Sequence, residues 1–298
     1  MESTLDCIAC MLEQSLRAAR AAAATEEVQE RVLRAVMRDL AQADWSGTPI
    51  DIAMPMHRSV RSLLGVDDPF VAHKRTATEQ ALAALPRLRR ALDLSGDPLH
   101  LALRISAAGN IIDLGALERY DLDAALERAL GVPFAIDDYA TLRQELDSAQ
   151  SLLLFADNAG EIVFDRLLLE TVLGIRKMDV SVCVKSGPFI NDATWQDALA
   201  AGLDQIGELS VLEVSNGDGA AAPAYGSAEV KRWIDQHDVV IAKGQANYEA
   251  LSDQPATYFV LMAKCPRVGE SLQVDTGDLI LKRNAPATHA QAQDAVRG

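Results

Sequence analysis

The chain has 298 residues, of which 49% are hydrophobic, and it carries a formal net charge of −15 at pH 7. This length allows one large or two ordinary domains, and the acidic balance argues against a nucleic-acid partner, because binding a polyanion needs a basic footprint. The four cysteines form no disulfide framework, no apolar run reaches the length of a membrane span, and the first residues lack the features of a signal peptide. We therefore expect no membrane association and a reducing compartment, the cytoplasm.

The first half of the sequence, from Ser3 to about Arg143, has helical periodicity almost throughout. Thr25 followed by two acidic residues is typical of a helix start, and Asp68-Pro69 is a second start signal. Pro86 is expected to kink or divide the long helix that follows, because proline lacks a backbone N–H. These patterns predict a helical domain or cap over residues 1–145.

Strands and helices alternate from Ser151 onward, which predicts βαβ units and a parallel sheet. The predicted strands are Leu152–Ala156, Val180–Val184, Ser210–Ser215, Val239–Ala242 and Tyr258–Met262, with an antiparallel edge strand at Asp278–Lys282. The fold class is therefore α/β, with a Rossmann-like, mainly parallel sheet flanked by helices over residues 146–283. This domain would bind metal and substrate, and residues 284–298 would form a flexible tail.

Polar residues follow the apolar strands of this second half. They are Asp157 and Asn158 after the first strand, Lys185, Asn191 and Asp192 after the second, Lys243 and Asn247 after the fourth, and Lys264 after the fifth. In a parallel sheet these strand ends meet at one edge, where ligands bind. Asp157, Asn158 and Asp192 supply hard oxygen ligands that suit Mg²⁺ or Mn²⁺, and lysines suit a phosphate. The combination predicts metal-dependent phosphoryl chemistry.

Each of these residues also has a structural interpretation. Asp157 and Asp192 could each cap the helix that follows, and Lys185 or Lys243 alone could be an ordinary surface lysine. The functional interpretation depends on their occurring together at successive strand ends.

Several segments of the chain resemble the DUF89 family of metal-dependent damage-control phosphatases, also called the ARMT1-like family. They are FADNAGEIVFDRLLLE, VKSGPFINDAT, VVIAKGQANYEAL and FVLMAKCP in the second half, and CIAC and AAGNIID in the helical half. The resemblance implies a helical region joined to a Rossmann-like domain, with a divalent metal (Mg²⁺, Mn²⁺, Co²⁺ or Ni²⁺) held by Asp157, Asn158 and Asp192. It also implies hydrolysis of small phosphomonoesters, such as sugar phosphates or damaged or surplus phosphometabolites.

The same resemblance suggests roles for further residues. Lys243, Asn247 and Lys264 match family positions expected near the substrate phosphate, where the lysines would neutralise charge in the transition state. Asn110 and Asp113 would line the cleft from the helical side, although Gly109-Asn110 is also a common turn sequence.

The nucleophile is left open by the sequence. A metal-activated water could attack phosphorus, or Asp157 could attack it and form an aspartyl-phosphate. Glu161 would orient water, or it could simply interact with the helix dipole.

Two other functions are compatible with parts of the sequence. An S-adenosylmethionine-dependent carboxyl methyltransferase needs a glycine-rich turn after its first strand, whereas the first strand here leads into Asp157-Asn158-Ala159-Gly160, with a single glycine. A non-catalytic phosphometabolite-binding protein would bind a phosphate ester without turnover.

The Cys7 and Cys10 pair could bind metal, act as a redox pair or pack within a helix. Nothing in the sequence specifies the substrate or the oligomeric state.

Overall fold

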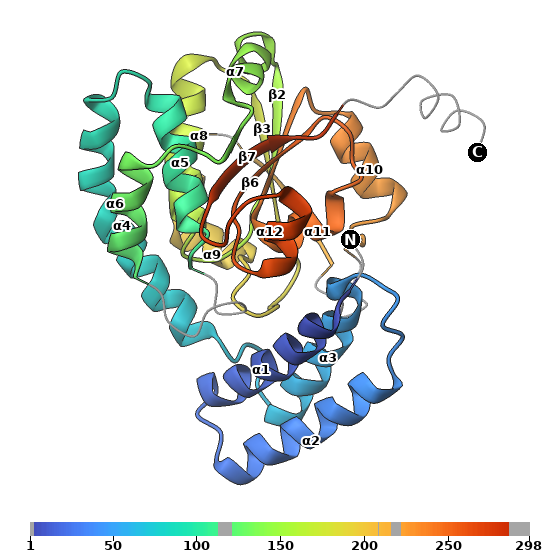
Figure 1. Ribbon diagram of the computed structural model, residues 1–298. Helices are drawn as coiled ribbons and strands as arrows, with labels where there is room; N and C mark the ends of the chain where they lie inside the picture. The colour runs from blue at the N-terminus through green and yellow to red at the C-terminus, as the bar shows by residue number, and fades with distance from the viewer. Residues whose placement is uncertain (1–2, 113–120, 208, 216–221, 286–298) are drawn as a thin grey trace, which may run out of the picture.

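The structure of the chain is a computed structural model that describes residues 3–112, 121–207, 209–215 and 222–285 (Figure 1). Within these residues, seven strands form one sheet in the order β1-β7-β6-β5-β2-β3-β4. The strands are β1 (Ile136–Asp137), β2 (Ser151–Phe155), β3 (Asp179–Lys185), β4 (Leu209–Val214), β5 (Val239–Lys243), β6 (Thr257–Met262) and β7 (Leu279–Arg283). All neighbouring strands are parallel except β6 and β7. The predicted α/β class with a mainly parallel sheet is confirmed.

Strand β7 is antiparallel as predicted, but its predicted position at the edge of the sheet is wrong. The short strand β1 pairs with its outer side, with Ile136 opposite Ile280. The backbone N–H groups of Ala135 and Asp138 also donate to the Leu279 and Leu281 carbonyls. The sequence gives little indication of this pairing, because β1 has only two residues and its partner lies far along the chain.

Twelve α-helices accompany the sheet in the described residues. They are α1 (Leu5–Ala21), α2 (Glu26–Gln42), α3 (Pro49–Leu64), α4 (Val71–Asp93), α5 (Pro98–Gly109), α6 (Leu122–Gly131), α7 (Tyr139–Ser148), α8 (Ile162–Ile175), α9 (Trp195–Ala200), α10 (Ala228–Asp235), α11 (Gly244–Leu251) and α12 (Pro266–Leu272). Thr25 caps α2 as predicted, because its side chain accepts a hydrogen bond from the Val28 N–H. None of the described helices combines the length and apolarity needed to cross a membrane.

Helix α4 runs through Pro86 without interruption, so of the two predicted effects of Pro86, a kink or a division, the division is wrong and the kink stays a prediction. One face of α4 is buried along its length by Ala77, Ala81, Leu85, Leu88 and Leu92. This continuous packing keeps both sides of the proline in one helix, since burial of an apolar face contributes more to helix stability than local propensity does.

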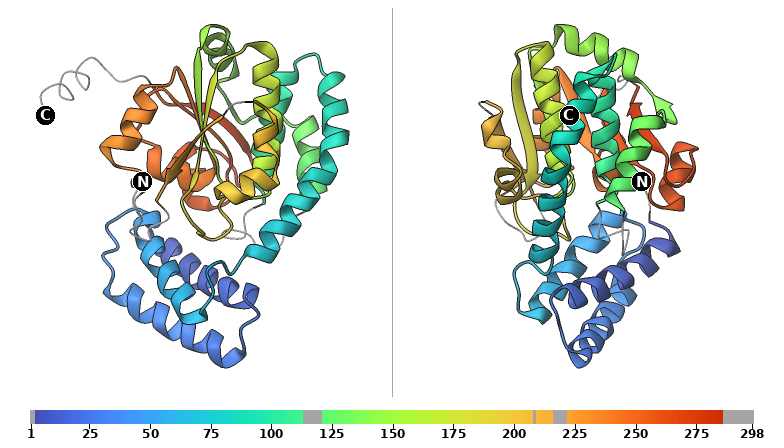
Figure 2. Two further views of the ribbon diagram at one scale, coloured as in Figure 1. Left: turned by 180° about the vertical axis from the view of Figure 1, so that it is seen from behind. Right: turned by 90° about the vertical axis from the view of Figure 1, so that its left-hand side faces the viewer.

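The central strands are buried on both faces by helices (Figure 2). Alternate side chains of β2 enter two different cores: Leu152 and Leu154 pack with α4, α5 and α8, whereas Leu153 and Phe155 pack with α10, α11 and α12. This alternation follows from the two-residue period of a strand. It holds β2 rigidly in the middle of the sheet, and the residues that follow β2 are therefore precisely positioned.

Helices α1, α2 and α3 form a separate bundle below the carboxyl edge of the sheet as drawn in Figure 1. Their core contains Met11, Val36 and Met56, together with Phe189 from the loop after β3. Helices α4, α5 and α6 instead share a core with the sheet. The helical region over residues 1–145 thus contains two groups of helices, and its treatment as one domain stays a proposal.

Candidate active site

The carboxyl ends of β2, β3 and β5 lie next to one another, because β2 is between the other two strands. The chain moves outward from β2 through β3 to β4 and later returns to the other side of β2 with β5. Such a switch in strand order opens a crevice at the carboxyl ends of the strands. Asp157 and Asn158 follow β2, and Asp192 follows β3 after a short loop.

Backbone contacts hold these three residues side by side. The Ala193 N–H donates to the Asp157 carbonyl at 2.7 Å, and the Ala159 N–H donates to the Asn191 carbonyl at 2.9 Å. Asn158 and Asp192 form an isolated antiparallel bridge. The loops after β2 and β3 are therefore joined by main-chain hydrogen bonds, so their side chains have a fixed mutual position.

The Asp157 carboxylate is held by two amide side chains. Its Oδ2 accepts hydrogen bonds from Asn110 Nδ2 and Asn158 Nδ2, both at 2.8 Å. The same two amides donate to Glu161 Oε2 at 2.8 and 2.9 Å. Asn110 is the C-cap that directly follows α5, so the helical region contributes directly to the arrangement of Asp157.

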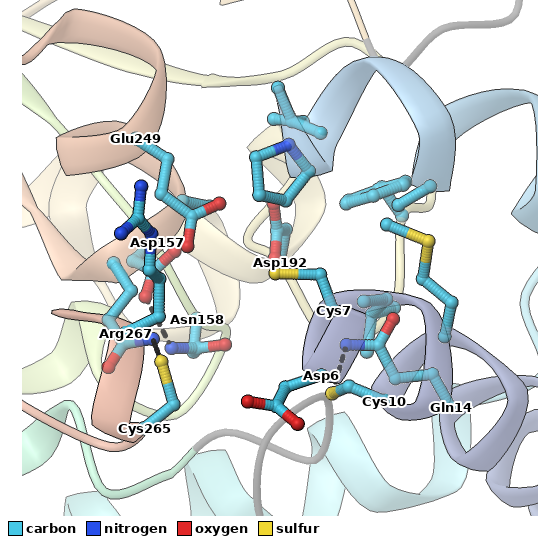
Figure 3. Close-up of a pocket in the computed structure, with 18 of the residues that line it drawn as sticks. Asp6, Cys7, Cys10, Gln14, Asp157, Asn158, Asp192, Glu249, Cys265 and Arg267 are labelled. Atoms are coloured by element: carbon cyan, nitrogen blue, oxygen red, sulfur yellow. Dashed lines mark hydrogen bonds between the residues drawn. The ribbon is translucent and has the colours of Figure 1, made fainter. Parts of the chain in front are cut away.

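The residues present fit a divalent metal by their donor chemistry. The Asn158 amide nitrogen is engaged by two carboxylates, and its oxygen is turned towards the open pocket beside Asp192 (Figure 3). Two carboxylates and one amide oxygen are the hard donors that Mg²⁺ and Mn²⁺ accept. Among the described residues there is no cluster of three or more His, Cys, Asp or Glu side chains that could hold a metal ion. The donor set described here has two carboxylates, and its third donor is the Asn158 amide oxygen.

Lys185 lies against Asp192, with 3.5 Å between Nζ and Oδ2. The ammonium donates to the Tyr225 hydroxyl at 2.6 Å and lies 4.3 Å from the centre of the Tyr225 ring. Burial by itself would lower the pKa of Lys185, but Tyr225, Asp192 and Asp157 outweigh burial and raise the pKa above its ordinary value. The side chain is therefore a permanent cation beside the two aspartates.

Asn247 binds the hydroxyl of Tyr225, which is the hydrogen-bond partner of Lys185. Its Oδ1 accepts a hydrogen bond from the Tyr225 hydroxyl at 2.6 Å, and its Nδ2 donates to the Ala156 and Lys243 carbonyls at 3.0 and 2.7 Å. Asn247 thereby ties together the ends of β2 and β5. Its amide is used within the protein.

Lys243 is completely buried and forms an internal ion cluster. Its ammonium donates to Glu161 Oε1 and lies 3.0 Å from Asp165 Oδ1, while the Ser106 hydroxyl also donates to that Asp165 oxygen, at 2.7 Å. Burial raises the pKa of Asp165 to about 6; the Lys243 charge opposes this rise and the Glu161 charge adds to it. Burial would lower the pKa of Lys243, but Asp165 and Glu161 raise it above its ordinary value. Lys243 and Glu161 thus lie together, behind the pocket.

One pocket of about 350 Å³ opens in front of Asp157, Asn158 and Asp192 (Figure 3). Its other walls come from α1, α3, the loop after β3, α11 and the start of α12. The lining residues from these walls are Asp6, Cys7, Cys10, Met11, Gln14, Pro49, Ile50, Ala53, Phe189, Ile190, Gln245, Ala246, Glu249, Cys265, Pro266 and Arg267. The pocket therefore lies between the three-helix bundle and the sheet.

The remaining predicted site residues have different positions. Asn110, Lys185, Lys243, Asn247 and Lys264 are buried around the pocket and do not line it. The backbone N–H of Lys264 donates to Gln245 Oε1. Asp113 lies outside the described residues.

Several pocket residues were missed by sequence reasoning. Arg267 lies five residues after the end of β6 and lines the pocket. Its guanidinium is a side-chain group well suited to bind phosphate. Its signal was available, because it follows the same strand as Lys264. Asp6 and Glu249 had no such signal, since they lie on helices that reach the pocket only through the tertiary fold. Cys7 and Cys10 both line the pocket, and none of the four cysteines of the chain forms a disulfide.

The chain is similar to known phosphatases over nearly its whole length. A family model for the damage-control phosphatase ARMT1-like domain matches residues 3–280. A damage-control phosphatase of Pyrococcus horikoshii is 31% identical over 290 residues, which cover 95% of this chain and 99% of that protein. One from Archaeoglobus fulgidus is 32% identical over 287 residues, covering 93% and 97%. The crystal structure of a DUF89 family protein from Pyrococcus horikoshii superposes with a TM-score of 0.82 at 31% identity, covering 95% of this chain and 99% of that one.

Proposed function

The chain belongs to the damage-control phosphatase family with the ARMT1-like domain and is a phosphatase of phosphorylated metabolites; from this premise we propose that it hydrolyses small phosphomonoesters with a divalent metal held at the carboxyl edge of its sheet. Asp157, Asn158 and Asp192 are the metal ligands in this proposal. The metal is Mg²⁺, Mn²⁺, Co²⁺ or Ni²⁺. A methyltransferase is disfavoured, because it needs a glycine-rich turn after its first strand, whereas β2 leads into oxygen donors and only one glycine.

The main support for this proposal is the negative charge of the pocket. Among the described residues that line it, the charged side chains are four carboxylates and one guanidinium: Asp6, Asp157, Asp192, Glu249 and Arg267. A phosphate dianion would be repelled from such a pocket, because like charges disfavour one another most strongly where water is scarce. A divalent cation bound by the two aspartates reverses the local charge and makes the pocket suitable for phosphate.

A bound metal would supply Lewis-acid polarisation of the phosphate and would lower the pKa of a bound water. The protein residues prepare its ligands. Lys185 lies beside Asp192 and limits its movement. Asn110 fixes Asp157 and Glu161 through one amide group. Arg267 is the pocket cation suited to bind a phosphate oxygen.

Asp157 is assigned to holding the metal and not to attacking phosphorus. Its Oδ2 accepts two amide hydrogen bonds, and the carboxylate is 5% exposed. These contacts fix its orientation towards Asn158. Glu161 is completely buried, so in this proposal it positions Asn158 and does not orient the attacking water. Lys243 donates a hydrogen bond to Glu161 and holds it in this position.

We place this activity in the cytoplasm, in agreement with four free thiols, two of them in the pocket wall. The partner is a small phosphorylated metabolite that fits a pocket of about 350 Å³.

The proposal is tested with the purified protein after chelation of metals. We expect hydrolysis of 4-nitrophenyl phosphate to disappear on chelation and to return with Mg²⁺, Mn²⁺, Co²⁺ or Ni²⁺. Asp192→Asn should lower kcat/KM at least ~100-fold and weaken metal binding measured by calorimetry, because an amide replaces a charged ligand. Asp39→Asn, an exposed position on α2, is the matched control and should retain wild-type values. Full activity of Asp192→Asn, or undiminished activity after chelation, would contradict the metal site.

A further inference from the structure

We propose that the pocket selects phosphomonoesters whose alcohol part carries an uncharged apolar arm, and that it rejects esters bearing a second anionic group. This inference rests on the proposed function and specifies its substrate class. The bundle of α1, α2 and α3 is the part of the molecule that makes the selection.

Apolar side chains form part of the wall opposite the strand ends. Met11 from α1 and Ile50 and Ala53 from α3 line the pocket, and all three are buried. Asp6 and Gln14 on α1 also line this wall. An alkyl or aryl group placed against the three apolar residues would be removed from water, whereas a polyol placed there would lose hydrogen bonds to water that these residues cannot replace.

The apolar wall extends to the metal ligands through the loop after β3. Phe189 and Ile190 line the pocket, and Asp192 follows two residues later. Ile190 has a φ of 46°, which is an outlier for a β-branched residue. The Asp192 N–H closes this turn on the Phe189 carbonyl at 2.9 Å. A strained turn thus joins an apolar side chain to a proposed metal ligand, so the apolar contact begins next to the phosphate position.

Two carboxylates lie in the outer pocket, together with the amide side chains of Gln14 and Gln245. The Asp6 carboxylate, in the first turn of α1, points into the pocket, and Glu249 on α11 lies on the other side of it (Figure 3). Among the described residues that line this pocket, Arg267 is the one cationic side chain. A carboxylate or second phosphate on the substrate would be repelled by the Asp6 and Glu249 carboxylates.

The inference is tested with phosphonates, which bind like phosphate esters and are not hydrolysed. Their dissociation constants are measured by calorimetry with the metal-loaded protein for ethylphosphonate, hexylphosphonate and 6-phosphonohexanoate. Each buried methylene should strengthen binding about fourfold, so hexylphosphonate should bind at least tenfold more tightly than ethylphosphonate. The terminal carboxylate should weaken binding at least tenfold relative to hexylphosphonate. The kcat/KM values of the corresponding phosphate esters should follow the same order.

Two variants assign these preferences to their residues. Ala53→Leu fills the apolar wall and should reduce the hexyl-to-ethyl ratio at least threefold; Ala41→Leu, at an exposed position on α2, is its control. Asp6→Asn should improve binding of 6-phosphonohexanoate about threefold relative to hexylphosphonate, because one repulsive charge is removed. Asp39→Asn is its control. Thermal unfolding of each variant shows whether it has folded. If a variant does not fold, the ligand series measured with the wild-type protein still tests the inference.

The outcomes separate this inference from the proposed function. Equal affinity for ethylphosphonate and hexylphosphonate, or tighter binding of 6-phosphonohexanoate, overturns the inference while phosphatase activity stands. If no ester is hydrolysed under any metal but the phosphonates bind in the expected order, the selectivity holds and the catalytic proposal fails. If no phosphonate binds, the inference fails, and the hydrolysis assay alone decides the proposed function.

Discussion

At the scale of single residues, Gly244 shows how closely the candidate site is built. It begins α11 directly after β5 with a φ of 76°, in the left-handed region that glycine adopts without strain. A Cβ atom at this position would stand 1.8 Å from Asp157 Oδ2 and 2.9 Å from Asn110 Nδ2. The space that a side chain would need is occupied by the carboxylate and by the amide that orients it.

We therefore expect Gly244→Ala to displace Asp157 and to lower kcat/KM for 4-nitrophenyl phosphate at least ~100-fold, since small misplacements of catalytic groups are costly. Gly65→Ala is the matched control. Gly65 also has a positive φ, 66°, but nothing lies within 4 Å of the added Cβ. It should lose about 1 kcal/mol of stability and keep its activity. Wild-type activity of Gly244→Ala would show that Asp157 does not need this position.

The buried cluster of Lys243, Glu161 and Asp165 is a second residue-scale feature. A lysine after a strand end suggests a substrate contact in sequence, but here two carboxylates surround the ammonium. Its contribution is positional, because it holds Glu161, whose other oxygen accepts from Asn158. Such a cluster is sensitive to loss of one member, which would leave a buried charge without its partner.

At the scale of elements, the crossing of α5 and α8 controls the position of Asn110. Gly109 is the last residue of α5, and a Cβ added to it would lie 2.4 Å from Phe164 Cδ2 on α8. The Phe164 ring is completely buried in the core, so it has little room to move. The close approach of the two helices thus requires a residue without a side chain at the end of α5.

Gly109→Ala should therefore destabilise the protein by about 1–3 kcal/mol through overpacking. It should also lower activity, because Asn110 and its bonds to Asp157 and Glu161 would shift. Chemical denaturation and kcat/KM measure the two effects. Gly174→Ala on α8, where nothing lies within 4 Å of the added Cβ, should instead leave activity unchanged and raise stability by up to about 0.5 kcal/mol. Equal stability of the two variants would argue against the close helix contact.

At the scale of the whole molecule, the three-helix bundle and the sheet meet at the pocket and are tied together by specific contacts. Arg61 on α3 donates to the Pro188 carbonyl at 2.7 Å. Lys74 on α4 pairs with Asp68, in the segment that follows α3, at 3.2 Å and with Asp197 on α9 at 2.6 Å, so it links the end of the bundle to the helices of the sheet. We propose that chemistry and substrate selection are divided between two parts of the molecule: the sheet edge supplies the proposed metal ligands, and the bundle supplies part of the apolar wall.

The stability of the whole molecule should depend on pH through His57 in the bundle. His57 is buried and its Nε2 lies 3.1 Å from Gln14 Oε1. Burial, with Arg61 nearby, lowers the pKa of His57 to about 3 from an ordinary value of 6.5. Between these values the unfolded chain binds a proton that the folded chain does not, so stability falls as pH decreases from about 6.5 towards 3. The slope from this one group is at most ~1.4 kcal/mol per pH unit.

His57→Gln should remove this part of the pH dependence. The free energy of unfolding, measured by denaturation between pH 7 and about pH 5, should change less steeply in the variant than in the wild type. His73→Gln, at an exposed position on α4, should keep the wild-type slope. A variant slope equal to that of the wild type would mean that His57 titrates normally in the folded protein.

Much of the fold was accessible from local patterns. The alternation of apolar strands and helices after Ser151 predicted the α/β class, the parallel strands and the antiparallel β7, because buried parallel strands are continuous apolar runs with turn residues at their ends. The position of β7 inside the sheet was not accessible, since β1 has only two residues. The uninterrupted α4 was not accessible either, because its packing on the sheet core decides the effect of Pro86.

The sequence by itself determined the fold class and the three proposed metal ligands, since Asp157, Asn158 and Asp192 follow neighbouring strands and parallel topology brings such positions together. Only the tertiary structure decided what surrounds them. It buried Lys243 between two carboxylates and brought Asp6 and Ala53 to the opposite wall of the pocket. The physical reason is the range of the interactions involved. A strand end is specified by its immediate neighbours, whereas the exposure of a charge or the wall of a cavity depends on packing between segments that are far apart in the sequence.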